Sequence, residues 1–237
     1  MMRPSDWSIV RALPLFNDMS ESNFAALMNA AFLQRFPIHV GLITEGDLPD
    51  FLHIVVDGTV ELYATHDGRE TTLDIINPVT TFILAAVIRD EAYLKSARTL
   101  SPAQVLMVPA QTVRDVFGRD AAFARAIVNE LADRYRDIVR ALKNEKLRSS
   151  AERLANWILR EDARQGNRRE VTLQFDKRTL ASRLGMTPEN LSRNLAQLAR
   201  HGLRTTGHRI VIDDRAALER FGHPNELIDG PRALTRA

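Results

Sequence analysis

The spacing of apolar and polar residues divides the chain into a strand-rich half and a helical half. After a short helical pattern near residues 20–30, the apolar runs between 36 and 117 are brief and are broken by turn signals such as His66-Asp67-Gly68. This pattern is typical of β-strands. The runs 51–56 and 60–63 flank Asp57-Gly58, and we expect them to form a hairpin because glycine tolerates the positive φ of a tight turn. Several such hairpins would close into a small barrel or roll.

A long helix is predicted from about residue 120, since neither Gly nor Pro occurs again before Gly166. Apolar residues recur along it at alternating spacings of 4 and 3, which is a heptad seam. Docking against its own domain would explain such a seam, but the register holds for nearly three heptads and favours pairing with a second subunit. The predicted dimer interface consists of Ala124, Val128, Leu131, Tyr135, Ile138 and Leu142.

A second group of helices follows a predicted break at residues 148–150, where serine can cap a new helix over 151–164. Val171-Thr172-Leu173 is then expected to form a short strand. Residues 176–203 indicate a helix-turn-helix, with Gly185 in the sharp turn between the two helices. Thr187 is a good N-cap for the second helix, and Pro188 fits its first position, where the missing N–H costs nothing.

The second helix of this motif separates an apolar stripe from a polar face. Leu191, Leu195 and Leu198 form the stripe, at i, i+4 and i+7. Glu189, Ser192 and Arg193 share another face at the N-terminal end of the helix, which is the end that enters the major groove in this motif. Arginine can donate two hydrogen bonds to guanine, and a carboxylate can accept a hydrogen bond from the amino group of cytosine. Serine can form a hydrogen bond with a base or with a phosphate.

A two-stranded wing is predicted over residues 202–212, turning at Gly207, and its arginines are expected to contact phosphates. Within 177–209 there are seven basic residues and one acidic residue, which favours a polyanion partner. A solvated basic face without a partner is the alternative that charge alone leaves open. The predicted contacts to double-stranded DNA are Lys177, Arg178, Thr187, Glu189, Asn190, Ser192, Arg193, Arg204 and Arg209.

Composition excludes several other classes of protein. The 237 residues are 45% hydrophobic and 26% charged, with a net charge of +2, as in globular proteins with real cores. The absence of cysteine excludes disulfides, thiolate-bound zinc and cysteine-held iron–sulfur clusters. No catalytic motif is present, so we expect no enzyme and no metal site. The N-terminus lacks a signal-peptide core and no apolar run spans a bilayer, so we expect a cytoplasmic protein without membrane contact.

Taken together, these segments resemble the Crp-Fnr family of bacterial transcription regulators over roughly residues 10–215. The resemblance is carried by residues 41–47, residues 52–60 and the helix-turn-helix. It implies an α+β fold with an N-terminal jelly-roll of the cyclic-nucleotide-binding type, a long dimerisation helix and a C-terminal winged helix-turn-helix. It also implies a homodimer that binds DNA, with RNA polymerase as a further partner of activators. The expected division is 1–118 for the roll, 119–147 for the dimerisation helix, 148–222 for the DNA-binding domain and 223–237 for a loosely attached tail.

The second helix looks like the Fnr-type reader Glu-x-x-Ser-Arg, with Pro188 and Ser192 at the places where the Crp-type pattern has arginine and glycine. This likeness implies a palindrome of TTGAT-type half-sites, matching the two-fold symmetry of a dimer.

The resemblance also locates an effector pocket, but its usual contacts are altered. The family's Gly-Glu and Arg-Ser/Thr pairs are replaced by Leu84-Ala85 and Lys95-Ser96. Lysine lacks the planar, two-pronged contact that arginine makes with a phosphate. We therefore expect a small effector other than cyclic AMP, and the open choices are haem, another small ligand or none. A cyclic-nucleotide-responsive regulator and a ligand-binding module that regulates another protein are the alternative functions.

Candidate haem ligands are confined to three histidines of the roll, His39, His53 and His66. Surface turn positions account for His39 and His66, and an ordinary strand position accounts for His53. We favour these structural roles over haem ligation.

Overall fold

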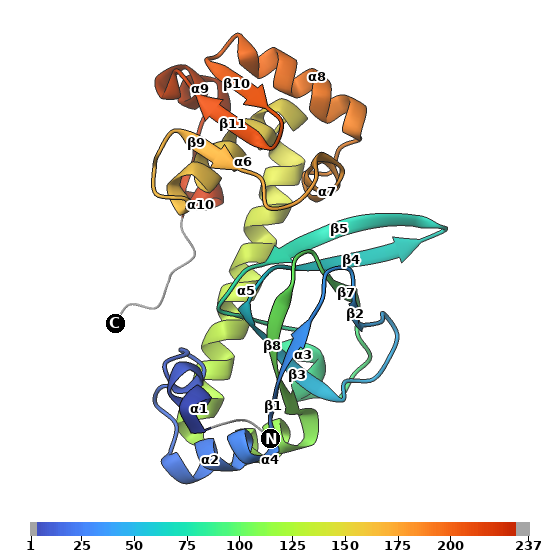
Figure 1. The fold of residues 1–237 in the computed structure, drawn as a ribbon, viewed down its shortest axis with the longest axis vertical. Helices are drawn as coiled ribbons and strands as arrows, with labels where there is room; N and C mark the ends of the chain where they lie inside the picture. Colours follow the sequence, from blue (N-terminus) through green and yellow to red (C-terminus); the bar gives the residue numbers. More distant parts are fainter. Residues whose placement is uncertain (1–3, 231–237) are drawn as a thin grey trace. The chain divides into compact units, whose positions relative to one another are not determined.

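The computed structural model describes residues 4–230, and the chain divides into two units, Met1–Arg134 and Tyr135–Ala237. Helix α5 (Ala121–Leu147) belongs to both units. The predicted α+β class, with a roll of β-strands, a long helix and a C-terminal winged helix-turn-helix, is confirmed (Figure 1). None of the helices in the described part of the chain is long and apolar enough to cross a membrane.

The first unit is built from two antiparallel sheets of four strands, with the orders β1-β8-β3-β6 and β2-β7-β4-β5. The strands are β1 (Phe32–Phe36), β2 (Gly41–Ile43), β3 (Phe51–Asp57), β4 (Val60–His66), β5 (Arg69–Ile76), β6 (Thr80–Phe82), β7 (Ser96–Thr99) and β8 (Ala103–Pro109). Its other helices are α1 (Pro4–Arg11), α2 (Glu21–Ala30), α3 (Leu84–Arg89) and α4 (Ala110–Arg119).

The predicted hairpin around Asp57-Gly58 is wrong. β3 pairs with β6 and β8, whereas β4 pairs with β5 and β7, so the turn carries the chain from one sheet to the other. Gly58 has a φ of 83°, and a Cβ there would lie 2.3 Å from the carbonyl oxygen of Pro102. Glycine is therefore required here because the backbone of Pro102 comes too close for any side chain. A hairpin turn and a crossover can both impose this requirement, so the glycine alone does not distinguish them. The tight hairpin lies one turn later, at Asp67-Gly68 between β4 and β5.

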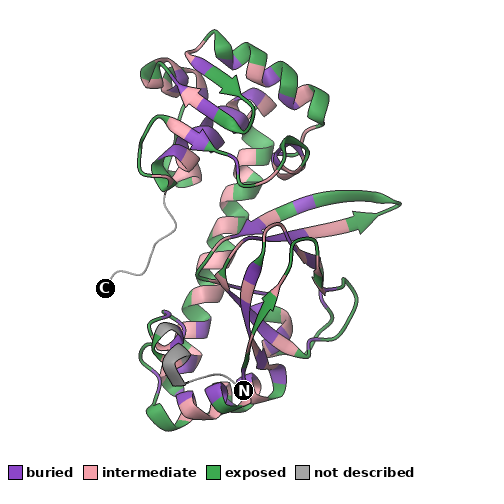
Figure 2. Ribbon diagram, viewed as in Figure 1, coloured by how far each residue is buried: buried purple, intermediate pink, exposed green. Residues whose placement is uncertain are grey.

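The apolar core of the first unit is formed by both sheets and by the helices that flank them. Leu52 and Ile54 of β3 and Val60 and Leu62 of β4 are at most 2% exposed, and all four belong to this core. Figure 2 shows the contrast between these buried strands and the exposed far end of the β4–β5 hairpin. The strand pattern of the sequence thus reflects a packed interior.

One buried carboxylate, Asp120, joins the starts of two helices in this unit. It accepts hydrogen bonds from the backbone N–H and hydroxyl of Ser20, from Asn23 and from the backbone N–H of Phe123, at 2.9–3.0 Å. Burial alone would raise the pKa of Asp120, but these hydrogen bonds outweigh it and hold the pKa far below the ordinary value. The ionised carboxylate therefore stabilises the beginnings of α2 and α5 together.

The second unit continues from the last turns of α5 into a winged helix-turn-helix. Its elements are α6 (Ser150–Arg164), β9 (Glu170–Thr172), α7 (Lys177–Arg183), α8 (Pro188–Ala199), β10 (Leu203–Thr206), β11 (Arg209–Ile212), α9 (Arg215–Gly222) and α10 (Glu226–Asp229). The strands form one antiparallel sheet, β10-β11-β9. The predicted break before α6 is confirmed, because Ser149 caps this helix and forms a reciprocal capping box with Glu152.

The segment after residue 222, predicted to be a loosely attached tail, is fastened to the second unit as far as Gly230. His223 ends α9, and the short helix α10 places Asp229 in ion pairs with Arg148 and Arg160. Proline and glycine in this stretch suggested a loose extension, whereas long-range charge pairing holds it. Residues 231–237 of the predicted tail lie outside the described residues.

Candidate nucleic-acid interface

The two helices of the motif begin and end where local signals place them. Asp176 caps α7 by accepting from the backbone N–H of Thr179 at 2.7 Å. Thr187 caps α8 by accepting from the backbone N–H of Asn190 at 3.2 Å, and Pro188 occupies the first turn. Gly185, between the helices, has a φ of 62°. The predicted turn and the predicted start of the second helix are both confirmed.

Helix α8 presents its polar N-terminal residues to solvent. Glu189, Ser192 and Arg193 are all exposed, while Leu191 and Leu198 are buried. The Ser192 hydroxyl donates to the Pro188 carbonyl at 3.0 Å, which orients its oxygen. The backbone N–H of Glu189 itself, then the Thr187 hydroxyl and the charge of Arg193, lower the pKa of the Glu189 carboxyl. The end of α8 thus offers an ionised acceptor and a guanidinium side by side.

The buried face of α8 differs from the predicted leucine stripe. Asn194 is only 6% exposed, whereas Leu195 is half-buried. The Asn194 amide donates to the Ser150 hydroxyl at 3.0 Å, and the half-buried Asn190 donates to the same hydroxyl at 3.4 Å. Asn190 was predicted to contact DNA, but its side chain is engaged with the start of α6. Both asparagines therefore set how α8 is seated on α6.

A buried arginine donates hydrogen bonds to the turn between α7 and α8, and the sequence analysis did not predict this role. Arg153 of α6 is 8% exposed, and its guanidinium donates to the carbonyls of Leu184 at 3.0 Å, Gly185 at 3.3 Å and Arg148 at 2.9 Å. Carbonyls at the end of a helix have no partner within it, and a cation there is favourable. An arginine on an amphipathic helix is normally read as exposed, so no sequence signal distinguishes Arg153. Asn194 was detectable, because it lies three residues after Leu191 on the inward face.

The basic residues flanking α8 lie at the surface. Lys177 and Arg178 are exposed at the start of α7. In the wing, Arg204 is paired with Asp213 at 2.5 Å and Arg209 with Glu170 at 3.4 Å. These exposed ion pairs contribute little stability. Both arginines can therefore exchange a carboxylate for a phosphate oxygen at small cost.

The exposed side of α5 carries the residues predicted to meet a second subunit. Val128, Tyr135, Ile138 and Leu142 are 55–69% exposed, while Ala124 and Leu131 are half-buried. Leu131 also contacts the core of the first unit, together with the fully buried Phe123 and Ile127. A row of large apolar side chains left in water is a feature of surfaces that bind another protein.

The predicted effector-pocket residues have unequal environments in the first unit. Leu84 is buried in the core and Ala85 is exposed, so neither supplies a polar contact. Ser96 is buried, and its hydroxyl accepts from the backbone N–H of Glu45 at 2.9 Å. Burial lowers the pKa of Lys95, and Arg134 lowers it further, while Asp74 opposes the shift. Lys95 is thus the one cation among the four residues, held in a mixed-charge environment.

The histidines considered as haem ligands do not face a common space. His39 and His66 are exposed beside turns. His53 is 3% exposed and stacks on Phe82 with 5.3 Å between ring centroids, and burial lowers its pKa to about 4. Because His53 is enclosed in the first unit, a haem could reach its ring nitrogens only if the side chains that cover them moved, so the arrangement does not fit an axial ligand. Within residues 4–230, no group of three potential metal ligands converges.

Comparison with known proteins defines the class to which the fold belongs. A cyclic nucleotide-binding domain model matches residues 33–120, and a Crp-like helix-turn-helix domain model matches residues 152–221. The CRP-like cAMP-activated global transcriptional regulator of Mycobacterium tuberculosis is 24% identical over 212 residues, covering 87% of this chain and 95% of that protein. The cyclic AMP receptor protein of Thermus thermophilus is 25% identical over 210 residues, covering 88% and 96%.

A solved structure supports the same fold. FixK2 from Bradyrhizobium japonicum superposes with a TM-score of 0.71 at 23% identity, covering 80% of this chain and 96% of that one. The roll, the long helix and the exposed polar end of α8 together define a DNA-binding transcription regulator. The chain belongs to the Crp-Fnr family, as the sequence resemblance implied.

Proposed function

We propose that the chain reads a palindromic operator of TTGAT-type half-sites through the N-terminal end of α8. The observation that carries this proposal is the joint exposure of Glu189, Ser192 and Arg193 on one end of one helix. Arg193 is assigned to guanine, Glu189 to the amino group of cytosine and Ser192 to a base or phosphate. An ionised carboxylate facing DNA is repelled by phosphates, and a base edge that donates a hydrogen bond offsets this repulsion.

Phosphate contacts are assigned to the surrounding residues. Lys177, Arg178, Arg204 and Arg209 are exposed cations, and Thr187 lies at the end of α8 that approaches the backbone. Such contacts fix the register of the protein on DNA without reading the sequence. Asn190 is assigned to the seating of α8 instead. A mobility-shift comparison tests the operator: the TTGAT palindrome should bind more tightly than a Crp-type TGTGA palindrome, and the reverse order would refute the half-site assignment.

The functional unit is proposed to be a homodimer, paired through the exposed apolar face of α5. The two-fold axis of such a dimer matches the symmetry of a palindrome. We retain 1–118 as the sensor roll and 119–147 as the dimerisation helix, and we extend the DNA-binding domain from 148–222 to 230 because α10 is bound to it. Such a regulator would act in the cytoplasm, and would contact RNA polymerase where its operator position makes it an activator.

The effector is proposed to be a small molecule other than cyclic AMP. Ala85 stands where the family has a glutamate for the ribose, and Lys95 stands where it has an arginine for the phosphate. The two relatives, a cAMP-activated regulator and a cyclic AMP receptor protein, favour the alternative, a cyclic-nucleotide response. Titration calorimetry with cyclic AMP and cyclic GMP separates the two, because micromolar binding of either nucleotide would establish the alternative.

A second alternative is a ligand-binding module that regulates another protein without touching DNA. The exposed reading face of α8 disfavours it. Failure of the purified protein to retard any DNA, in the presence or absence of cell extract metabolites, would favour it.

A further inference from the structure

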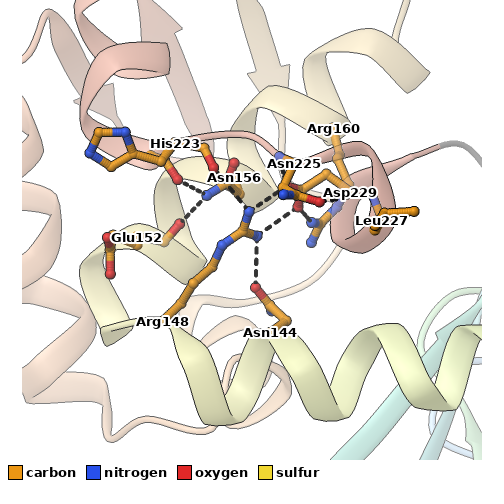
Figure 3. Close-up of polar contacts among 10 residues, drawn as sticks. Asn144, Arg148, Glu152, Asn156, Arg160, His223, Asn225, Leu227 and Asp229 are labelled. Atoms are coloured by element: carbon orange, nitrogen blue, oxygen red, sulfur yellow. Dashed lines mark hydrogen bonds and ion pairs between the residues drawn. The ribbon is translucent and has the colours of Figure 1, made fainter.

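The short helix α10 ends in Asp229, whose carboxylate pairs with Arg148, between α5 and α6, and with Arg160 of α6 (Figure 3). The Asp229 carboxylate accepts two hydrogen bonds from Arg148, at 2.5 and 2.8 Å, and one from Arg160 of α6. The side chains of Arg148 and Asp229 are only 6% and 10% exposed. A two-pronged pair of this kind fixes the geometry of both side chains, and removing one partner leaves the other charge shielded and uncompensated.

Arg148 lies at the joint between the dimerisation helix and the DNA-binding domain. α5 ends at Leu147 and Ser149 caps α6, so Arg148 is the residue between them. Its guanidinium also donates to Asn144 of α5 at 3.1 Å and to the carbonyl of His223 at 3.2 Å. Its own carbonyl accepts from Arg153, the residue that holds the turn of the motif. Arg148 therefore holds the junction of α5 and α6 through hydrogen bonds of both its side chain and its backbone carbonyl.

The charge balance at the junction of α5 and α6 depends on Asp229. Burial lowers the pKa of Arg160, and the nearby cations Arg183 and Arg148 lower it further, while Asp229 opposes them. Asp229 is itself kept ionised: burial raises its pKa, but the hydrogen bonds from Arg148 and from the backbone N–H of Asn225 lower it more. Without this carboxylate, the shielded Arg148 and the partly exposed Arg160 would have no opposite charge between them.

We propose that α10 is a latch in which Asp229, as a positioning residue, fixes the α5–α6 joint and thereby the spacing of half-sites that the dimer accepts. The inference rests on the proposed dimer. In such a dimer, α8 of each subunit is connected to the subunit interface through this joint. The distance between the two α8 helices sets the spacing of the half-sites. A stiff joint admits one spacing, whereas a loose joint admits several.

The test uses the full chain and the palindrome that the wild-type protein selects from random DNA. Derivatives of this palindrome carry one or two base pairs more or fewer between the half-sites, and each base pair moves a half-site by about 3.4 Å and turns it by about 34°. Wild type should lose about tenfold or more in affinity on each change, because simultaneous engagement of both half-sites is lost. Asp229→Asn should lose no more than about threefold across the same set, while its affinity for a single half-site stays unchanged.

Two further variants keep the result interpretable. Glu226→Gln removes an exposed carboxylate from the same helix and should retain the wild-type spacing profile. The double variant Arg148→Gln with Asp229→Asn removes the more buried cation together with the carboxylate and leaves only the partly exposed Arg160 without its partner, so it should fold more readily than Asp229→Asn, and it should show the broadened profile. A purely stabilising role for Asp229 would lower the melting temperature without broadening the profile.

The outcomes separate the latch from the dimer on which it rests. A sharp wild-type profile that Asp229→Asn or the folded double variant shares would overturn the latch. A wild-type protein that protects only one half-site and shows no spacing preference would instead refute the proposed dimer.

Discussion

The apolar face of α5 yields a quantitative prediction for Ile138→Glu. Ile138 is 65% exposed in the single chain. Full burial of an isoleucine side chain contributes about 1.5–3 kcal/mol, so covering this fraction contributes about 1–2 kcal/mol per subunit. The residue occurs twice in a two-fold dimer, which gives about 2–4 kcal/mol, or a 30- to 700-fold weaker dimer at about 1.4 kcal/mol per tenfold. Burying the new carboxylate adds to this loss.

Sedimentation equilibrium measures the dissociation constant directly. Asn129→Glu is the matched control, since it places the same side chain on an exposed polar position of the same helix and should leave the dimer intact. Leu131→Glu should also give monomers, but Leu131 contacts the core of its own unit, so its loss is confounded with unfolding. An Ile138→Glu protein as strongly dimeric as wild type would show that the exposed face of α5 is not the interface.

Other predictions concern the reading helix, the wing and the Asp120 joint. Arg193→Ala should cost about 1–3 kcal/mol of operator binding and relax discrimination at one base pair, whereas Arg204→Ala should weaken binding to every sequence and reduce the dependence of affinity on salt. Equal, sequence-independent losses in a mobility-shift series would refute these roles. Asp120→Asn should lower the free energy of unfolding at neutral pH by about 1–3 kcal/mol. Because the folded-state pKa of Asp120 is depressed, its contribution is present above the unfolded-state pKa of about 3.9 and is lost as pH falls. Chemical denaturation should therefore show the two proteins converging below pH 4; a difference that grows on acidification would contradict the assignment.

Features encoded by neighbouring residues could be predicted from the sequence. Thr187-Pro188 and Ser149 fixed the starts of α8 and α6, because capping uses residues within one turn. The exposed face of α5 followed from spacing alone. The partner of a strand could not be predicted in this way: Gly58 indicated a turn, but β3 pairs with β6 and β8, which follow later in the chain.

The long-range contacts of the buried arginines in the second unit could not be predicted from the sequence either. Arg153 and Leu184 are separated by 31 residues, and Arg148 and Asp229 by 81. Arg153 lies on a helix that carries many charged residues, and Arg148 lies just before that helix, so composition gave no reason to expect burial. The pairing of Asp229 with Arg148 and Arg160 explains why the segment that ends at Asp229 is not a loose tail.

Selection of bound sequences from random DNA by the purified full-length protein tests the central claim most directly. The account predicts enrichment of one inverted repeat whose half-sites are of the TTGAT type, because a two-fold dimer presents Glu189, Ser192 and Arg193 twice. Enrichment of a TGTGA repeat would contradict the assigned reading, and the absence of any enriched sequence would contradict the assignment of α8 as a base-reading helix.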